Sequence, residues 1–171
     1  MPRTPDALLL PANPWFIGLS LVAALLVNML PLGSHPARPD LLAVVLVFWN
    51  VHQPRRVGVG WAFLFGLLMD VHEGALLGQH ALAYTLISYT AITVHRRLLW
   101  FGPAGQTLQV LPLFLLATGV SALVRLALGG MPPGWALAWA PLVETLLWPL
   151  ARLLLLAPQR RPPDPDQDRP L

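Results

Sequence analysis

Long apolar runs separated by short polar breaks occupy nearly all of the chain. A helix that spans a bilayer needs about 20 mostly apolar residues. Several runs meet this requirement with few interruptions, and they cover residues 14–32, 74–94, 106–128 and 134–156. The pattern therefore predicts a membrane-spanning helix in each of these segments.

The segment 41–69 allows two interpretations, because the polar sequence HQPRR at residues 52–56 divides it into two short apolar runs. A re-entrant hairpin would bury Arg55 and Arg56 near the middle of the bilayer, at a cost of at least about 2.5 kcal/mol for each arginine. Two spans, over residues 39–52 and 56–70, keep both arginines at the membrane surface, where long basic side chains can snorkel. We favour two spans, which predicts an all-α membrane protein with six transmembrane helices.

Composition and charge support a membrane protein and predict its orientation. Hydrophobic residues make up 56% of the chain and charged residues only 11%, whereas a soluble domain usually carries about 25% charged residues. If the N-terminus is cytoplasmic, the inner loops contain Arg55, Arg56, Arg96 and Arg97. The positive-inside rule then predicts cytoplasmic N and C termini. Residues 1–157 would form the transmembrane domain, and the proline-rich tail at 158–171 is predicted to be disordered in the cytoplasm.

The sequence lacks the usual templates for catalysis and cofactor binding. It has no cysteine, which excludes disulfides and thiolate metal sites. No serine lies in a G-x-S-x-G motif, and no glycine-rich phosphate loop is present. The net charge of +3 is explained by arginines in inner loops and requires no nucleic acid partner. We therefore predict a protein that is not an enzyme and that uses no cofactor or metal. A membrane enzyme is the remaining alternative, and it would need a polar cluster at one depth that only Asp70, Arg125 and Glu144 could supply.

The sequence GLLMDVHEGALLG at residues 66–78 concentrates ionisable residues between two apolar runs. Asp70 is a good N-cap residue for the fourth helix, and Glu73 has the spacing of its partner in a capping box. A metal site built from Asp70, His72, Glu73 and His80 is an alternative, but their spacing matches no known metal motif. A contact surface for a ligand or partner stays open as a third interpretation.

Small residues on both sides of Asp70 predict close helix packing. Gly58, Ala62 and Gly66 precede it at steps of four residues, the pattern that lets membrane helices approach one another. Gly74 and Gly78 are predicted to begin a similar pattern on the fourth span. We expect this ridge and Asp70 to form a structural or partner contact.

Two further ionisable residues lie within predicted spans. Arg125 near the end of the fifth span either snorkels to the headgroups or pairs with Asp70, Asp40 or Glu73. Glu144 lies about ten residues into the sixth span, so roughly 15 Å deep at 1.5 Å per residue. An acid at such a depth is a candidate functional residue. It could equally be a protonated group that is hydrogen-bonded to Thr145 or Asn50.

Residues 38–82 resemble the bacterial rod shape-determining protein MreD family. The resemblance rests on Arg38-Pro39, an aromatic-rich second span that ends at Trp49, Pro54-Arg55, and a G-x-x-x-D-x-x-x-G motif followed by Leu-Gly. The matching motif positions are Arg38, Gly66, Asp70, Gly74 and Gly78. A late LLWP at residues 146–149 extends the resemblance more weakly over the rest of the chain.

This resemblance implies a non-enzymatic scaffold of the cell-wall elongation machinery in the bacterial inner membrane. Members of the family maintain rod shape together with MreC, the actin-like MreB, and the glycosyltransferase–transpeptidase pair that builds the lateral wall. The implied fold is similar to the substrate-binding subunit of energy-coupling-factor transporters. Contacts would form within the lipid bilayer, and self-association into a homo-oligomer stays open.

A small-molecule binding subunit of a vitamin-type energy-coupling-factor transporter is the alternative interpretation. Its size and number of spans suit this chain equally well. The neighbouring genes would distinguish the two, because a cluster of shape genes and a transporter ATPase indicate different functions.

Overall fold

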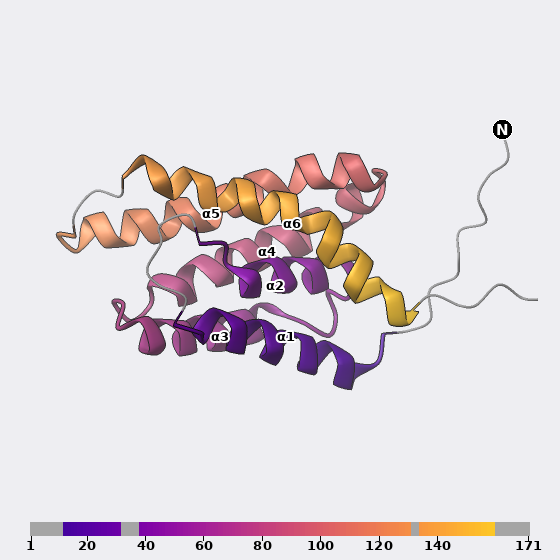
Figure 1. The fold of residues 1–171 in the computed structure, drawn as a ribbon, viewed down its shortest axis with the longest axis horizontal. Helices are drawn as coiled ribbons and strands as arrows, with labels where there is room; N and C mark the ends of the chain where they lie inside the picture. Colours follow the sequence, from indigo (N-terminus) through magenta and orange to yellow (C-terminus); the bar gives the residue numbers. More distant parts are fainter. Residues whose placement is uncertain (1–11, 32–37, 131–133, 160–171) are drawn as a thin grey trace, which may run out of the picture.

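The computed structural model describes residues 12–31, 38–130 and 134–159, and these residues form a bundle of α-helices (Figure 1). The helices are α1 (Pro14–Met29), α2 (Leu41–His52), α3 (Val59–Glu73), α4 (Gln79–Leu99), α5 (Pro103–Ala127) and α6 (Trp139–Leu156). Short 3-10 turns precede and follow α6, at Trp135–Ala138 and Ala157–Gln159. Within the described ranges the protein is therefore all-α with six helices, as predicted.

Helix α2 lies at the centre of the bundle. It packs against α1, α4 and α6, and its apolar side chains from Leu42 to Val51 are buried with the exception of Val45. Trp49 on α2 is fully buried, and its indole Nε1 donates a hydrogen bond of 2.8 Å to the Ser20 hydroxyl on α1. A short helix can thus be apolar on all sides because other helices surround it.

Side chains and proline define where several helices begin. The Asn13 side chain accepts a hydrogen bond from the Trp15 amide, and Pro14 occupies the first turn of α1, where its missing N–H leaves no bond unmade. Pro103 plays the same part at the start of α5. Asp40 caps α2 by accepting a 2.9 Å hydrogen bond from the Ala43 amide.

The loop that contains Arg55 and Arg56 separates two helices and lies at one end of the bundle. The Arg56 Nη1 atom donates a 2.7 Å hydrogen bond to the carbonyl of Ala12, just before α1 begins. A re-entrant hairpin would place this loop halfway along its neighbours. The contact at the start of α1 instead fits the prediction of two separate helices.

The helix bounds differ from the predicted ones most clearly around residues 70–79. Helix α3 continues to Glu73, and α4 begins only at Gln79. The intervening turn depends on Gly74 and Gly78, whose φ angles of 59° and 104° are left-handed. The prediction that these glycines open a packing ridge on the fourth helix was therefore wrong, because both lie in the turn.

Two helices within the described residues are long and apolar enough to cross a membrane, Pro103–Ala127 and Trp139–Gln159. Two shorter helices, Pro14–Met29 and Leu41–His52, are also strongly apolar. Most of the tail predicted to be disordered, residues 160–171, lies outside the described residues.

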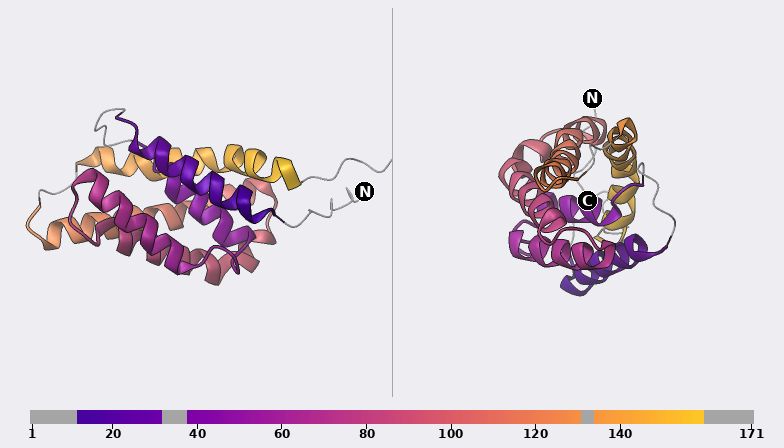
Figure 2. Two further views of the ribbon diagram at one scale, coloured as in Figure 1. Left: turned by 90° about the horizontal axis from the view of Figure 1, so that it is seen from below. Right: turned by 90° about the vertical axis from the view of Figure 1, so that its left-hand side faces the viewer.

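The bundle has two chemically different ends. The turned views show the helices running along one long axis, and α1 begins at the end where α6 finishes (Figure 2). That end also carries Arg55, Arg56, Arg96 and Arg97, and we call it the basic end. The opposite end, where α2, α4 and α6 begin, contains the pocket described next, and we call it the pocket end.

Candidate functional site at the pocket end

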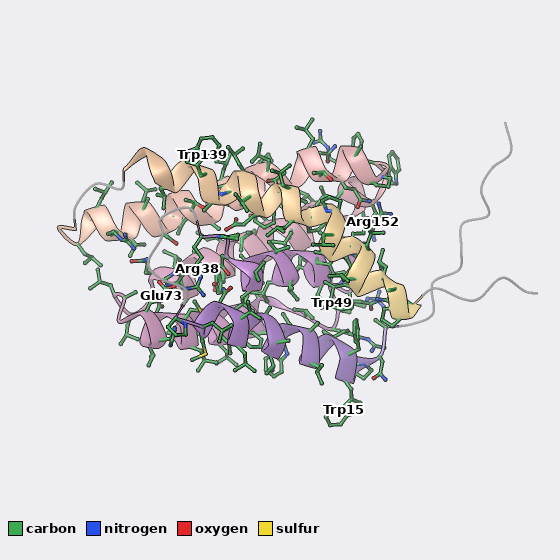
Figure 3. The ribbon with its side chains drawn as sticks, in the orientation of Figure 1. Trp15, Arg38, Trp49, Glu73, Trp139 and Arg152 are labelled. Atoms are coloured by element: carbon green, nitrogen blue, oxygen red, sulfur yellow. The ribbon has the colours of Figure 1, made fainter. Side chains whose placement is uncertain are left out.

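All acidic residues within the described ranges lie at the pocket end. They are Asp40, Asp70, Glu73 and Glu144. Figure 3 shows Arg38 and Glu73 toward this end, and Arg152 and Trp15 toward the other. Asp40, the pair of Asp70 and Glu73, and Glu144 lie far apart in the sequence, so the fold brings them together.

Asp40 connects four helices through its carboxylate and its amide. The carboxylate accepts a hydrogen bond of 2.7 Å from the Asn28 amide on α1 and a further one from the Tyr84 hydroxyl on α4. The Asp40 backbone N–H donates a 2.9 Å hydrogen bond to Glu144 Oε1 on α6. Asn28 also accepts a 3.1 Å bond from the Leu41 amide. Residues from α1, α4 and α6 therefore meet at the N-terminus of α2.

The predicted environment of Glu144 differs from the observed one. Thr145 donates its hydroxyl hydrogen to the carbonyl of Pro141 on the same helix, and the Asn50 amide has no hydrogen-bond partner among the described residues. Neither residue therefore bonds Glu144, which is only 4% exposed and pairs with Asp40. The acid lies beside the first residues of α2.

Arg38 closes the C-terminal end of α1. Its Nη2 atom lies 3.1 Å from the carbonyl oxygens of Val27 and Leu30 and also donates to the carbonyl of Asn28. The last carbonyls of a helix have no partner inside the helix and carry partial negative charge. The Arg38 guanidinium donates hydrogen bonds to these carbonyls and brings a positive charge to the negative end of the helix. Arg38 therefore stabilises the end of α1.

Asp70 caps α4 from the last turn of α3. Its Oδ2 atom accepts hydrogen bonds from the amides of Gly78 at 2.8 Å and Ala81 at 3.3 Å. Its Oδ1 atom accepts from the His80 amide at 2.7 Å and contacts His80 Nδ1 at 2.9 Å. The capping box of Asp70 and Glu73 was a wrong prediction, because both residues are in α3. The first N–H groups of α4 are nevertheless satisfied by Asp70, across the turn.

His80 lies between two carboxylates. Its Nδ1 atom faces Asp70, and its Nε2 atom lies 3.5 Å from Glu73 Oε2. No group of three or more acidic, histidine or cysteine side chains in the described parts of the chain is arranged to hold a metal ion. The arrangement supports a hydrogen-bonded corner between α3 and α4.

The small-residue ridge of α3 brings α4 close at one position. A Cβ atom added to Gly66 would lie 2.4 Å from the Cα of Ala81, closer than real atoms approach. Ala62 is fully buried, whereas a Cβ on Gly58 would meet nothing within 4 Å. Gly66 therefore sets the distance between the two helices directly below the Asp70 corner.

These groups surround a pocket with a volume of about 790 Å³. Glu144, Glu73 and His80 line it, together with a stripe on α5 formed by Thr118, Ser121 and Arg125. The spacing of three and four residues places this stripe on one helix face. Arg125 is exposed, and its predicted ion pair with Asp70, Asp40 or Glu73 is not formed; within the described ranges it has no ion pair.

Sequence patterns single out Asp70, Glu73, Arg38, Arg125 and Glu144, and Asp40 only as a possible partner of Arg125. They do not single out Asn28 and Tyr84, which bond Asp40. Tyr84 gave no signal, because a tyrosine within an apolar helix is common. Asn28 interrupted the first apolar run, and Asp40 preceded the second. Polar residues within or next to apolar runs, as at these two positions, are the sequence feature that could have indicated a buried polar network.

Comparison with known proteins identifies the family. A family model described as rod shape-determining protein MreD matches residues 11–157. A protein named rod shape-determining protein MreD, from Haemophilus influenzae, is 30% identical over 154 residues, which cover 86% of this chain and 93% of that relative.

No solved structure matches the chain significantly, so the expected likeness to the energy-coupling-factor subunit stays a prediction. Both matches favour the shape protein over the transporter subunit as the function of the chain. The chain belongs to the MreD family of rod shape-determining proteins, non-enzymatic membrane proteins of the cell-shape machinery.

Proposed function

We propose that this chain is a six-span scaffold of the cell-wall elongation machinery and contacts MreC within the inner membrane. The main support for this proposal is membership of the MreD family, because the matches to that family cover nearly the whole helical bundle. MreB and the glycosyltransferase–transpeptidase pair would be reached indirectly. In this proposal the chain binds its partners through contacts between helices and catalyses no reaction.

The distribution of exposed apolar side chains supports six spans. Helices α1 and α3–α6 all expose large apolar residues, such as Leu19, Leu68, Leu82, Leu108 and Leu146. Water would disfavour these surfaces, and lipid tails would cover them. Helix α2 exposes none, which agrees with its central position. The shorter α3 and the more polar α4 would therefore cross the bilayer as parts of this bundle.

The charges at the two ends support an orientation with cytoplasmic termini. The basic end carries several arginines and none of the described acids. At the pocket end, Arg38 and Arg125 are accompanied by all the described acids. Arginine-rich ends remain in the cytoplasm during insertion. We therefore place the pocket end on the outer side of the membrane.

The function is tested by depletion in a rod-shaped host that encodes this chain. Depletion should make the cells round, and re-expression of the chain should restore rods. A tagged chain purified from mild detergent should bring down MreC, whereas an unrelated six-span protein expressed at the same level should not. Rods that persist after verified loss of the chain, with no second copy present, would contradict the proposal.

A further inference from the structure

The pocket is large enough to bind a small molecule. Sites for small ligands are typically about 300–1,000 Å³, with a few convergent polar groups. The volume of about 790 Å³ falls within this range, and residues from α1, α3, α4, α5 and α6 contribute to the walls. A scaffold function does not require a cavity of this size with charged walls.

Several charged groups of the walls are already occupied by the fold. Three donors, from Asn28, Ala43 and Tyr84, reach the Asp40 carboxylate. Arg38 is bound by the last carbonyls of α1. The Asp40 carboxylate and the Nη2 atom of Arg38 therefore hold the walls in place and have little capacity left for a ligand.

The remaining charged groups of the pocket have opposite signs. Arg125 forms no ion pair with a described residue, and Thr118 and Ser121 lie on the same face of α5. Glu144 is almost fully buried, and while its Oε1 atom bonds Asp40, its Oε2 atom has no hydrogen-bond partner among the described residues. The Glu73 side chain is 44% exposed, and its one ion pair among the described residues is with His80, at 3.5 Å.

Two classes of ligand fit this arrangement poorly. A simple anion would be repelled by the carboxylates of Asp40, Glu73 and Glu144. A simple cation would leave the Arg125 guanidinium without a partner of opposite charge among the described residues. A molecule with both charges can satisfy the two sets at once. Glu144 lines the pocket and its Oε2 atom is not sealed from it, so an ammonium group can donate a charge-assisted hydrogen bond to this oxygen.

We propose that the pocket binds a zwitterion that carries an ammonium group and a phosphate or carboxylate group. The acidic group binds Arg125 with help from Ser121 and Thr118, and the ammonium group binds Glu144 and Glu73. The ligand has two natural sources, the headgroup of phosphatidylethanolamine in the surrounding bilayer or a free amino acid or short peptide. This inference goes beyond the scaffold function and does not depend on MreC.

Binding can be measured on the purified full-length chain by thermal unfolding in detergent. Glycerophosphoethanolamine represents the lipid headgroup, and alanine and dialanine represent the free source. Glycerophosphoglycerol, which lacks the ammonium group, is the matched control ligand. We expect concentration-dependent stabilisation by at least one of the zwitterions and by no comparable concentration of glycerophosphoglycerol. Stabilisation by the lipid headgroup alone would be accompanied by higher stability in nanodiscs of phosphatidylethanolamine than of phosphatidylglycerol.

Variants show whether binding occurs in this pocket. Arg125→Gln and Glu144→Gln should each weaken the apparent affinity for the zwitterion about tenfold or more, the size of a lost charge-assisted contact. The glutamine side chain of the second variant keeps an oxygen that can accept from the Asp40 amide, so the fold should persist. Arg97→Gln removes the same charge at the basic end and should leave the affinity unchanged.

The proposal is overturned if no zwitterion stabilises the folded chain, if glycerophosphoglycerol stabilises it equally, or if both pocket variants bind as the wild type does. Loss of rod shape on depletion tests the scaffold function separately. A chain that restores rod shape but binds no zwitterion would refute the ligand proposal and leave the scaffold function standing.

Discussion

The two ends of the bundle use charged residues in different ways. At the basic end, Arg96 and Arg97 form no ion pair with a described residue, and their effect depends on the sign of their charge. At the pocket end, Asp40 and Asp70 each accept hydrogen bonds from several elements, so their effect depends on geometry. The charges of Arg96 and Arg97 should be replaceable by others of the same sign, whereas the carboxylates of Asp40 and Asp70 should not.

The largest expected effect is at Gly66. Gly66→Leu should lower the free energy of unfolding by more than about 3 kcal/mol, because even its first side-chain atom would overlap the backbone of α4. Gly60→Ala is the matched control, since it lies on the same helix with nothing within 4 Å, and it should be neutral or slightly stabilising. Thermal unfolding in detergent measures both. A Gly66→Leu chain as stable as the wild type would disprove the close packing of α3 on α4.

Substitutions of Asp70 should have the second largest effect on the free energy of unfolding. Asp70→Leu leaves three amides of α4 and its preceding turn without an acceptor and should cost about 3 kcal/mol, since each buried unsatisfied donor costs about 1–3 kcal/mol. Asp70→Asn should be intermediate, at about 1–2 kcal/mol, because its amide nitrogen cannot accept from these donors.

At an ordinary N-cap, Asn replaces Asp with little loss of stability. Both oxygens of the Asp70 carboxylate accept backbone hydrogen bonds, so we expect Asn to replace Asp70 less well here. Rod-shape complementation should follow stability across both variants. An Asp70→Asn chain that is fully stable but does not restore rods would show that the charge itself has a function.

Tyr84 tests the other half of the pocket-end network. Tyr84→Phe removes the hydroxyl that donates to Asp40 and should lower the free energy of unfolding by about 1 kcal/mol. Tyr89→Phe is a suitable control, because Tyr89 is on the same helix and 62% exposed. Equal effects of the two changes would mean that the contact with Asp40 contributes nothing to stability.

The basic end should show the smallest effect on stability. Arg96→Lys and Arg97→Lys preserve the charge, and each should change the free energy of unfolding by less than about 0.5 kcal/mol. Replacing both by Gln should also leave unfolding nearly unchanged but increase the fraction of chains inserted in the wrong orientation. Protease protection of a C-terminal tag measures that fraction. A large loss of stability would place these arginines in a structural network.

Local patterns in the sequence predicted the helices, because apolar runs and arginine-rich breaks are properties of neighbouring residues. The same holds for Gly66, whose spacing from Ala62 and Asp70 indicates one helix face. The end of α3 was predicted three residues early, because the apolar run ALL after Gly74 resembles the start of a helix. The left-handed conformations at Gly74 and Gly78 prevent the helix from starting there.

The network at the pocket end could not be predicted in the same way. Glu144 bonds a backbone amide 104 residues earlier in the chain, and Tyr84 bonds a carboxylate 44 residues before it. Such pairs follow from how α4 and α6 pack around α2, which periodicity within one helix does not specify. The importance of Asp40 therefore emerged only from the packed bundle.

Single-cysteine labelling tests most directly whether the two ends lie on opposite sides of the membrane with the pocket outward. The chain has no cysteine, so one can be introduced at His72 on the pocket end or at Trp100 on the basic end, where both side chains are exposed. In intact spheroplasts, an impermeant thiol reagent should label His72→Cys, and it should label Trp100→Cys only after the membrane is permeabilised. Labelling of Trp100→Cys in intact spheroplasts, with His72→Cys protected until permeabilisation, would contradict an outward-facing pocket end.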